Sequence, residues 1–254
     1  MQHIVRVLYP HDSTRRVWRG PLRGCRYIVR PGIGLTMAWG LDNMQLPFLA
    51  SKTRPGQVIY DVGANCGQMA LFFSRMTGPE GKVIAFEPVR ENVEVARRNL
   101  EINAIHNVDM RELALAREAG EQEFLFDPDR HTMGVLASES VKMRDWDSTM
   151  KVRCDSIDHL VDSGLPAPDV LKIDVEGAAA EVLGGAGKLL SERPPSLFIE
   201  LHALDHAAPE LRLLDDLRDR FGYRVTDITG ALSEPPGIDW GGSVWCDPPG
   251  KIET

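Results

Sequence analysis

Cysteine is scarce in this 254-residue chain, and the four copies present have no spacing typical of a metal site. Cys25, Cys66, Cys154 and Cys246 lie far apart with no Cys-x-x-Cys pair, so neither a zinc site nor a disulfide framework is expected. No apolar run approaches the ~20 residues that a membrane-spanning helix needs. The N-terminus lacks the apolar stretch of a secretory signal. We therefore expect a cytoplasmic protein with reduced cysteines.

Positively charged residues are also fewer than negatively charged ones. The chain has 29 Lys and Arg against 37 Asp and Glu, a formal net charge of -8. Such an excess of negative charge is unfavourable for a nucleic acid or an anionic membrane as partner, and we expect neither. The hydrophobic fraction of 43% and the charged fraction of 26% are ordinary for a globular protein. The length suits one large α/β domain, or one domain with a small appendage.

Strands and helices alternate regularly from residue 57 onward, which indicates a parallel sheet with helices on both faces. The strands expected in this part of the chain cover residues 58–62, 83–86, 108–114, 122–126, 152–155, 170–173 and 197–201, followed by an antiparallel pair at 223–226 and 243–245. The expected helices cover residues 68–76 and 90–103, an Ala/Leu-rich stretch that ends before Pro194, and an amphipathic stretch around 211–221.

Residues 1–56 lack this alternation. They offer only short candidate strands at 4–8 and 26–29 and a helical turn at 46–52. We therefore predict an N-terminal appendage or lid over residues 1–56 and the main domain over residues 57–254.

A glycine-rich turn follows the first strand of the main domain. Gly63, Asn65 and Gly67 allow the chain to bend sharply and to pass close to a ligand without a side-chain clash. The helix expected after Gly67 presents free N–H groups and its positive dipole end to an anionic group. Asp61 is a polar residue at the end of an apolar strand, where a carboxylate can reach an ammonium group. The turn therefore suits both ends of an amino acid.

A second acidic residue narrows the identity of the ligand. Glu87 ends the next buried strand, where the ribose hydroxyls of a bound nucleoside would lie. A dinucleotide fingerprint requires a small residue where Gln68 stands. The pattern thus favours a nucleoside joined to an amino acid, as in S-adenosylmethionine (SAM), over NAD. A site for NAD and a purely structural turn are the alternatives.

Four segments, in order, resemble a known family. They are Tyr60-Asp61-Val62-Gly63-Ala64-Asn65-Cys66-Gly67, Ala85-Phe86-Glu87-Pro88, Ala114-Leu115-Ala116 and Leu171-Lys172-Ile173-Asp174-Val175-Glu176-Gly177. From about residue 57 to 202 the chain resembles the FkbM-type methyltransferases of the class I SAM-dependent methyltransferases. The resemblance implies a seven-stranded, mostly parallel, Rossmann-like α/β sheet, SAM as cofactor, and O-methylation of a small molecule or sugar. It also implies cofactor contacts at Pro88 and Ala114.

The sequence departs from the family at one place. A second glutamate commonly follows the Asp-Val-Glu-Gly motif closely, whereas here three alanines at 178–180 precede Glu181. If that carboxylate contacts the acceptor in the family, then this protein has a different substrate or a different base from the other members.

The chemistry of methyl transfer points to candidate catalytic residues. The reaction is an in-line displacement, so positioning supplies most of the acceleration, and a hydroxyl acceptor must also lose a proton to a base. Asp174, Glu176 and His202 follow the strands at 170–173 and 197–201, at the sheet edge where ligands bind. We expect Asp174 near the SAM amine and sulfonium, and Glu176 or His202 as the base. The alternatives are stabilisation of a helix start by Glu176 and a structural hydrogen bond from His202.

The same residues suggest the partners and the competing functions. Mg²⁺ favours carboxylate oxygens, but these ligands have no diagnostic spacing, so we assign no metal site. Residues 127–150 are expected to line or cover the acceptor pocket, with a surface insertion as the alternative. The expected partner is a small-molecule acceptor, a natural product or sugar hydroxyl, and the sequence leaves a homo-oligomer open. The competing functions are an NAD-dependent oxidoreductase or epimerase, and a degenerate methyltransferase fold serving as a binding module.

Overall fold

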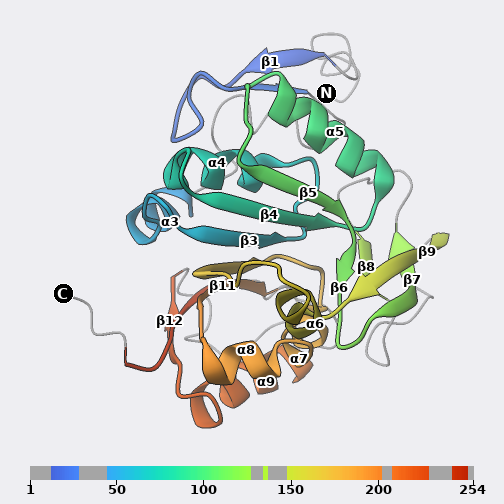
Figure 1. Cartoon of the computed structure of the whole chain (residues 1–254), viewed down its shortest axis with the longest axis vertical. Helices are drawn as coiled ribbons and strands as arrows, with labels where there is room; N and C mark the ends of the chain where they lie inside the picture. The colour runs from blue at the N-terminus through green and yellow to red at the C-terminus, as the bar shows by residue number, and fades with distance from the viewer. Residues whose placement is uncertain are drawn as a thin grey trace.

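A seven-stranded sheet forms the centre of the protein (Figure 1). The computed structural model describes residues 13–28, 45–126, 134–136, 148–201, 208–228 and 242–250. In spatial order the strands are β12 (Arg224–Asp227), β13 (Gly242–Asp247), β11 (Ser196–Leu201), β10 (Val170–Ile173), β3 (Val58–Val62), β4 (Lys82–Glu87) and β5 (Val108–Glu112). Only β13 runs antiparallel to its neighbours β11 and β12, and the other pairs are parallel. The predicted seven-stranded, mostly parallel sheet is confirmed.

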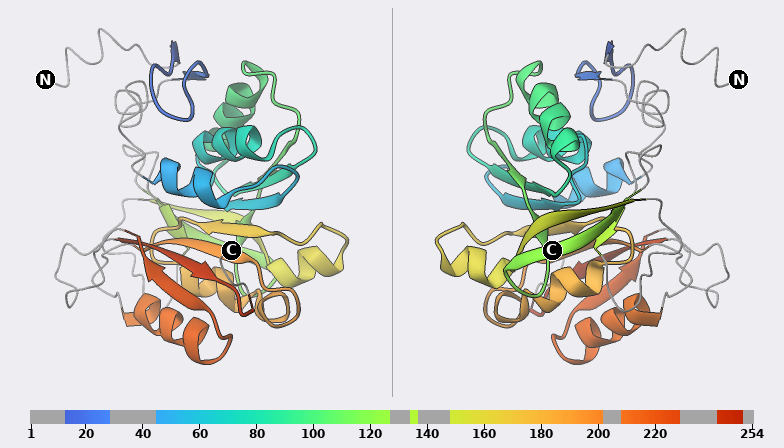
Figure 2. Two further views of the ribbon diagram at one scale, coloured as in Figure 1. Left: turned by 90° about the vertical axis from the view of Figure 1, so that its left-hand side faces the viewer. Right: turned by 90° about the vertical axis from the view of Figure 1, so that its right-hand side faces the viewer.

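Helices cover both faces of this sheet (Figure 2). One face packs against α3 (Leu46–Lys52), α4 (Gln68–Thr77) and α5 (Arg90–Glu101), and the other against α6 (Ile157–Asp162), α7 (Ala179–Gly184), α8 (Gly187–Glu192) and α9 (Ala208–Asp219). Strand β10 is buried at all four positions because apolar residues enclose it from both sides. In the part of the chain that the structure describes, no helix has the length and apolar character to cross a membrane.

Two smaller sheets flank the central one. β1 (Thr14–Arg16) and β2 (Arg26–Ile28) form an antiparallel pair beside α5. β6 (Ala114–Leu115), β7 (Gly120–Phe126), β8 (Gly134–Leu136) and β9 (Ser148–Asp155) form a four-stranded sheet in the order β6-β9-β7-β8. The candidate strand at residues 4–8 lies outside the described residues.

The structure corrects two predicted elements. The strand expected over 108–114 ends at Glu112, and Ala114 begins β6, which pairs with β9 instead. The single helix expected before Pro194 is two short helices, α7 and α8, because the chain turns at Gly185 close to another backbone segment. A Cβ atom at Gly185 would lie 2.1 Å from the carbonyl oxygen of Ala116, so only glycine fits there.

The connectivity contains one reversal that determines where a ligand can bind. From β3 the chain adds β4 and then β5 on one side, and it returns to place β10 and β11 on the other side of β3. The boundary between β3 and β10 is therefore the topological switch point, and the crevice at the carboxyl ends of these strands is the expected ligand site of an open α/β sheet.

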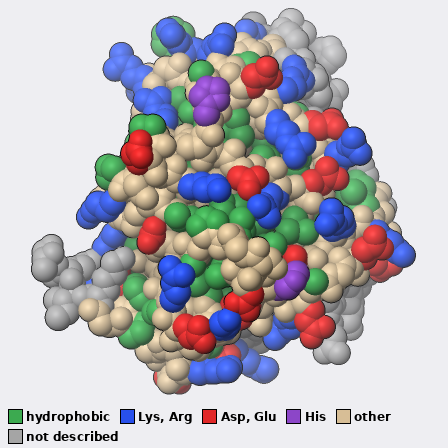
Figure 3. Space-filling model, in the orientation of Figure 1, with side chains coloured by type: hydrophobic (Ala, Val, Ile, Leu, Met, Phe, Trp, Pro, Cys, Tyr) green, Lys and Arg blue, Asp and Glu red, His purple; other side chains and the backbone are tan. Residues whose placement is uncertain are grey.

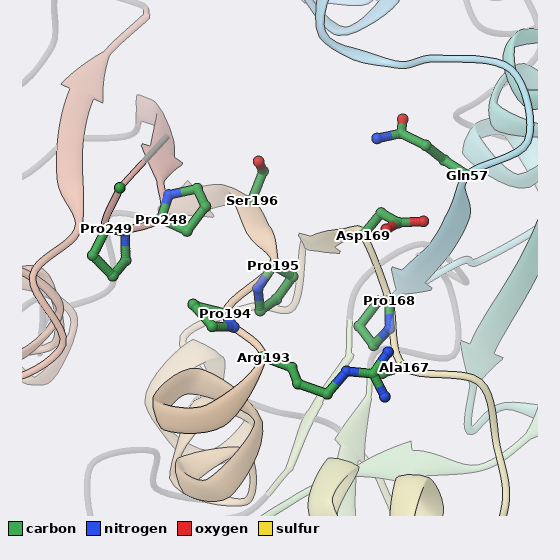
Figure 4. A pocket seen from close by; sticks show the side chains of 11 residues that line it. Gln57, Ala167, Pro168, Asp169, Arg193, Pro194, Pro195, Ser196, Pro248 and Pro249 are labelled. Atoms are coloured by element: carbon green, nitrogen blue, oxygen red, sulfur yellow. The ribbon is translucent and has the colours of Figure 1, made fainter. Parts of the chain in front are cut away.

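A hollow lies at the opposite edge of the sheet from this expected site. Figure 4 shows a cavity of about 430 Å³ near the amino ends of β3, β10 and β11, lined among others by Pro168, Pro195 and Pro248. The carboxylate of Asp169 in its wall accepts a hydrogen bond from the backbone N–H of Val58 at 2.8 Å. This cavity is remote from the switch-point crevice.

On the face drawn in Figure 3, positive and negative side chains are interspersed, with no broad field of one sign.

Candidate functional site

The glycine-rich turn after β3 adopts a conformation that its residues permit and most others do not. Gly63, Asn65 and Gly67 all have positive φ angles, of 75°, 48° and 83°. The backbone N–H groups of Gly63 and Ala64 both donate to the carbonyl oxygen of Phe86 at 3.0 Å, which fixes the turn to the end of β4. Gly67 is the N-cap of α4, and the first backbone N–H groups of a helix have no partner within the helix. The turn predicted from sequence is present in the structure.

Glu87 lies next to this turn and holds it in place. Its side chain is buried, and one carboxylate oxygen accepts a hydrogen bond from the Asn65 N–H at 2.9 Å. The other oxygen accepts from the Val89 N–H at 3.1 Å and from the Asn92 amide at 3.2 Å. Burial raises the pKa of Glu87, and the hydrogen bonds from Val89 and Asn92 oppose this rise. Three donors leave acceptor capacity on a carboxylate, so Glu87 can still accept from a ligand hydroxyl.

A buried ion cluster spans the switch point. Lys172 of β10 is paired in register with Asp61 of β3, and its Nζ lies 3.0 Å from Asp61 Oδ1. The same Nζ lies 3.3 Å from Asp174 Oδ2, because residues two apart in a strand share one face. The Lys172 and Asp61 side chains are 2% and 0% exposed, whereas that of Asp174 is 35% exposed. The cluster thus runs from the core of the sheet to the crevice.

The charges in this cluster sustain one another. Burial alone lowers the pKa of Lys172, but the carboxylates of Asp61 and Asp174 outweigh that effect, so the pKa is raised and the ammonium stays charged. Burial raises the pKa of Asp61, and the Lys172 charge opposes the rise. The ammonium that Asp61 meets in this structure therefore belongs to the protein. With no exposed surface on Asp61, a direct contact with a ligand amine stays a prediction, and the geometry favours an indirect role.

The remaining predicted residues are distributed around this crevice end. Pro88 is half-buried directly after Glu87, and the Leu113 N–H donates to the Glu87 carbonyl, which brings Ala114 beside it. Glu176 is half-buried in the turn between β10 and α7. His202 lies outside the described residues, so its proposed role as a base is not placed. Most of the predicted acceptor segment at 127–150 also lies outside them.

Two further observations concern alternatives weighed from the sequence. Glu181, which follows the three alanines, forms an ion pair with Arg117, with 2.9 Å between Glu181 Oε2 and Arg117 Nε. Among the described residues, no group of three or more His, Cys, Asp or Glu side chains is arranged to hold a metal ion.

Sequence reasoning missed the support that the N-terminal segment gives to the turn. The carbonyl oxygen of Cys66 accepts hydrogen bonds from the Tyr27 hydroxyl at 3.1 Å and from the Asn99 amide at 2.9 Å. The Asn99 side chain also accepts from the Ile28 N–H at 2.9 Å. The only available signal was an asparagine on the buried face of an otherwise apolar helix stripe, since a buried amide requires partners. Strand β2 is thus joined through α5 to the glycine-rich turn.

Lys172 belongs to the Leu171–Gly177 motif, and the sequence alone assigns it no role. A lysine inside a buried apolar strand requires a counter-charge. Its partner follows from strand register, which the sequence does not specify, although Asp61 and Glu200 are charged residues within the neighbouring predicted strands at 58–62 and 197–201.

Comparison with known proteins identifies the family. A model of the methyltransferase FkbM domain matches residues 61–225. The 31-O-demethyl-FK506 methyltransferase FkbM of Streptomyces tacrolimicus is 30% identical over 191 residues, which cover 63% of this chain and 71% of that protein. The hexuronic acid methyltransferase AglP of Haloferax volcanii is 29% identical over 194 residues, which cover 76% of this chain and 69% of that protein.

Solved structures agree on the fold. The crystal structure of a methyltransferase FkbM from Methylobacillus flagellatus has a TM-score of 0.51 and 20% identity, covering 76% of this chain and 44% of that one. This chain therefore spans less than half the length of that structure. A precorrin-6y C5,15-methyltransferase from Geobacter metallireducens has a TM-score of 0.52 and 14% identity, covering 87% and 94%.

The family model covers more than half of the chain, including the glycine-rich turn, Glu87 and the Asp-Val-Glu-Gly motif. The predicted family, the predicted sheet and the predicted cofactor are confirmed together. The chain belongs to the FkbM methyltransferase family, and its cofactor is S-adenosylmethionine.

Proposed function

We propose that the protein transfers the SAM methyl group to a hydroxyl oxygen of a small molecule or sugar. The observation that carries the proposal is the meeting of the glycine-rich turn, Glu87 and Asp174 at the carboxyl end of the sheet, on the switch point. A ligand bound there would meet the N-terminal end of α4, Glu87 as an acceptor for ribose hydroxyls, and the partly exposed carboxylate of Asp174. These groups match the carboxylate, ribose and cationic parts of SAM.

Each group has a proposed role in cofactor binding. The turn from Gly63 through Asn65 to Gly67 receives the methionine carboxylate at the start of α4. Glu87 accepts from the ribose hydroxyls, with Pro88 and Ala114 beside it. Asp174 lies near the amine and the sulfonium.

The methyl transfer requires the protein to align the acceptor with the methyl group and to accept one proton. The acceptor oxygen attacks the methyl carbon in line with the C–S bond, the sulfur keeps the electron pair, and the acceptor proton passes to a base. Glu176, which follows β10 in the turn before α7, is the proposed base among the described residues, with His202 as the second candidate.

The relatives support the class of acceptor. One acts on a hexuronic acid and another on the 31-O position of a demethylated FK506, so both names indicate small, oxygen-rich acceptors. A direct test incubates the protein with methyl-labelled SAM and a panel of uronic acids and polyhydroxylated natural products. Label in an O-methyl product supports the proposal. Tight SAM binding with no turnover on the whole panel would favour a binding module instead.

Replacing Glu87 by glutamine should weaken SAM binding about 10- to 100-fold, because the ribose hydroxyls lose a charged acceptor. Isothermal titration calorimetry measures the effect. Glu112→Gln is a matched control, since Glu112 is the in-register neighbour of Glu87 on β5 but is exposed. Equal SAM affinity for Glu87→Gln and wild type would remove Glu87 from the cofactor site.

Replacing Glu176 by glutamine should lower kcat about 10²- to 10⁴-fold while SAM affinity stays within a factor of two or three of wild type, as expected for a general base. Single-turnover assays with labelled SAM separate the two effects. Glu181→Gln serves as the control, because Glu181 lies on the next helix, α7, and forms an ion pair with Arg117. An unchanged kcat for Glu176→Gln would leave His202 as the remaining candidate base.

A further inference from the structure

A lysine lies inside β10, a strand that is buried at every position. Lys172 is 2% exposed and ranks among the largest fully enclosed side chains of the protein. A charge so placed is unfavourable unless it is paired and hydrogen-bonded. The question is what this ammonium does beyond neutralising Asp61.

The contacts of Lys172 reach both walls of the cofactor crevice. Besides the two carboxylates, Nζ donates to the carbonyl oxygen of Gly63 at 3.2 Å and lies 3.4 Å from that of Val62. Gly63 belongs to the turn that follows β3, and Asp174 belongs to the segment that follows β10. An ammonium has three donors, and here they converge on groups from both sides of the switch point.

We infer that Lys172 is a positioning residue for the cofactor, an internal ammonium that holds the Gly63 carbonyl and the Asp174 carboxylate in their places at the SAM site. Asp61 is its anchor in the core and makes no contact with the cofactor. This inference rests on the proposed placement of SAM against Gly63 and Asp174.

The charge balance around Lys172 supports this role. Asp61 from β3 and Asp174 after β10 contact the ammonium, and Glu200 of β11 and Glu87 of β4 also act on it. With Lys172 present, the contact cluster carries one net negative charge. Without it, two carboxylates would share a site that burial already disfavours for the ionised form of Asp61, and one of them would bind a proton.

Three variants separate positioning from simple stabilisation. Asp61→Asn keeps Lys172 on Asp174 and Gly63, so SAM affinity should stay within about threefold of wild type. Lys172→Met leaves Asp61 buried without a counter-charge, which should lower the urea midpoint strongly. The double variant Asp61→Asn, Lys172→Met removes both buried charges, so its midpoint should recover most of that loss.

The double variant is decisive for binding. Because neither buried charge remains, this variant should fold, but it lacks the ammonium that holds Gly63 and Asp174. We therefore expect its SAM affinity to be about tenfold or more below that of wild type, an effect of the size of one lost hydrogen bond to a charged group. Calorimetric titration with SAM and thermal unfolding are measured on the same samples. Wild-type affinity in the double variant would overturn the inference. Loss of SAM binding in Asp61→Asn alone would also overturn it, because the contacts of Lys172 with Gly63 and Asp174 would then be insufficient to hold the cofactor site.

A pH profile adds a signature that packing does not produce. In Lys172→Met the folded-state pKa of Asp61 lies above its unfolded value, so the stability of this variant should decrease as the pH rises through that folded pKa. The double variant, which lacks the Asp61 carboxyl, should not show the decrease, and an identical pH profile for both would count against the charge role of Lys172. If the wild-type protein itself failed to bind SAM, the proposed function would be rejected together with this inference.

Discussion

Gly63→Ala should destabilise the protein by about 4 kcal/mol or more and abolish measurable SAM binding, the largest effect of a single methyl group expected in this chain. A Cβ at this position would lie 1.9 Å from the Asp174 carbonyl oxygen and 3.0 Å from its carbonyl carbon. Backbone atoms cannot yield as a flexible side chain can, so β3 and β10 would have to separate at the switch point. Urea unfolding and SAM titration measure the two effects.

The contribution of backbone strain can be separated from that of the clash. Gly56 has a φ of 82°, close to the 75° of Gly63, but a Cβ there would meet no heavy atom within 4 Å. Gly56→Ala therefore carries only the penalty of the left-handed conformation, roughly 1–2 kcal/mol. If Gly63→Ala were no more destabilising than Gly56→Ala, the close approach of the turn to Asp174 would not exist in solution.

The sequence was most informative where burial is complete. The bounds of β3 and β10 agree with prediction to the residue, because these strands are enclosed on both faces and are apolar at every position except Asp61 and Lys172. The glycine-rich turn and the acidic end of β4 could be predicted equally well. Only a few residue types readily adopt positive φ angles, and only a few carry a charge into a buried strand. Both features depend on local sequence alone.

Prediction failed where a contact between distant segments decides the structure. The turn at Gly185 depends on its approach to Ala116, and the change from β5 to β6 depends on pairing with β9. The partner of Lys172 depends on strand register, which no local pattern encodes. The position of the N-terminal segment depends on single asparagine side chains, Asn99 in α5 and Asn103 just after it. Whether residues 1–56 act as a separate unit stays a prediction that these asparagines can test.

Asn99→Ala should destabilise the protein by about 2–4 kcal/mol and weaken SAM binding severalfold, because one buried amide joins three parts of the structure. Asn99 is fully buried, and its oxygen accepts the Ile28 N–H of β2 while its NH₂ donates to the Cys66 carbonyl of the glycine-rich turn. Alanine leaves the Ile28 N–H without its acceptor in the core. The Cys66 carbonyl keeps the Tyr27 hydroxyl, so the turn should loosen without collapsing.

Asn103 provides the matched control, four residues after Asn99 and just beyond the end of α5. Its amide bonds the backbone of Arg26 in both directions, accepting from the N–H at 2.8 Å and donating to the carbonyl at 2.6 Å, but it is only half-buried. Water can replace these bonds, so Asn103→Ala should be destabilised by less than about 1 kcal/mol and should bind SAM like wild type. Urea unfolding, SAM titration and limited proteolysis within residues 13–28 compare the two variants. If both variants behaved alike, the N-terminal strands would be an appendage without influence on the cofactor turn. A larger effect of Asn99→Ala on all three measurements would mean that β2 is part of the cofactor site's support, since its Tyr27 and Ile28 reach the carbonyl and the amide that hold Cys66 in place.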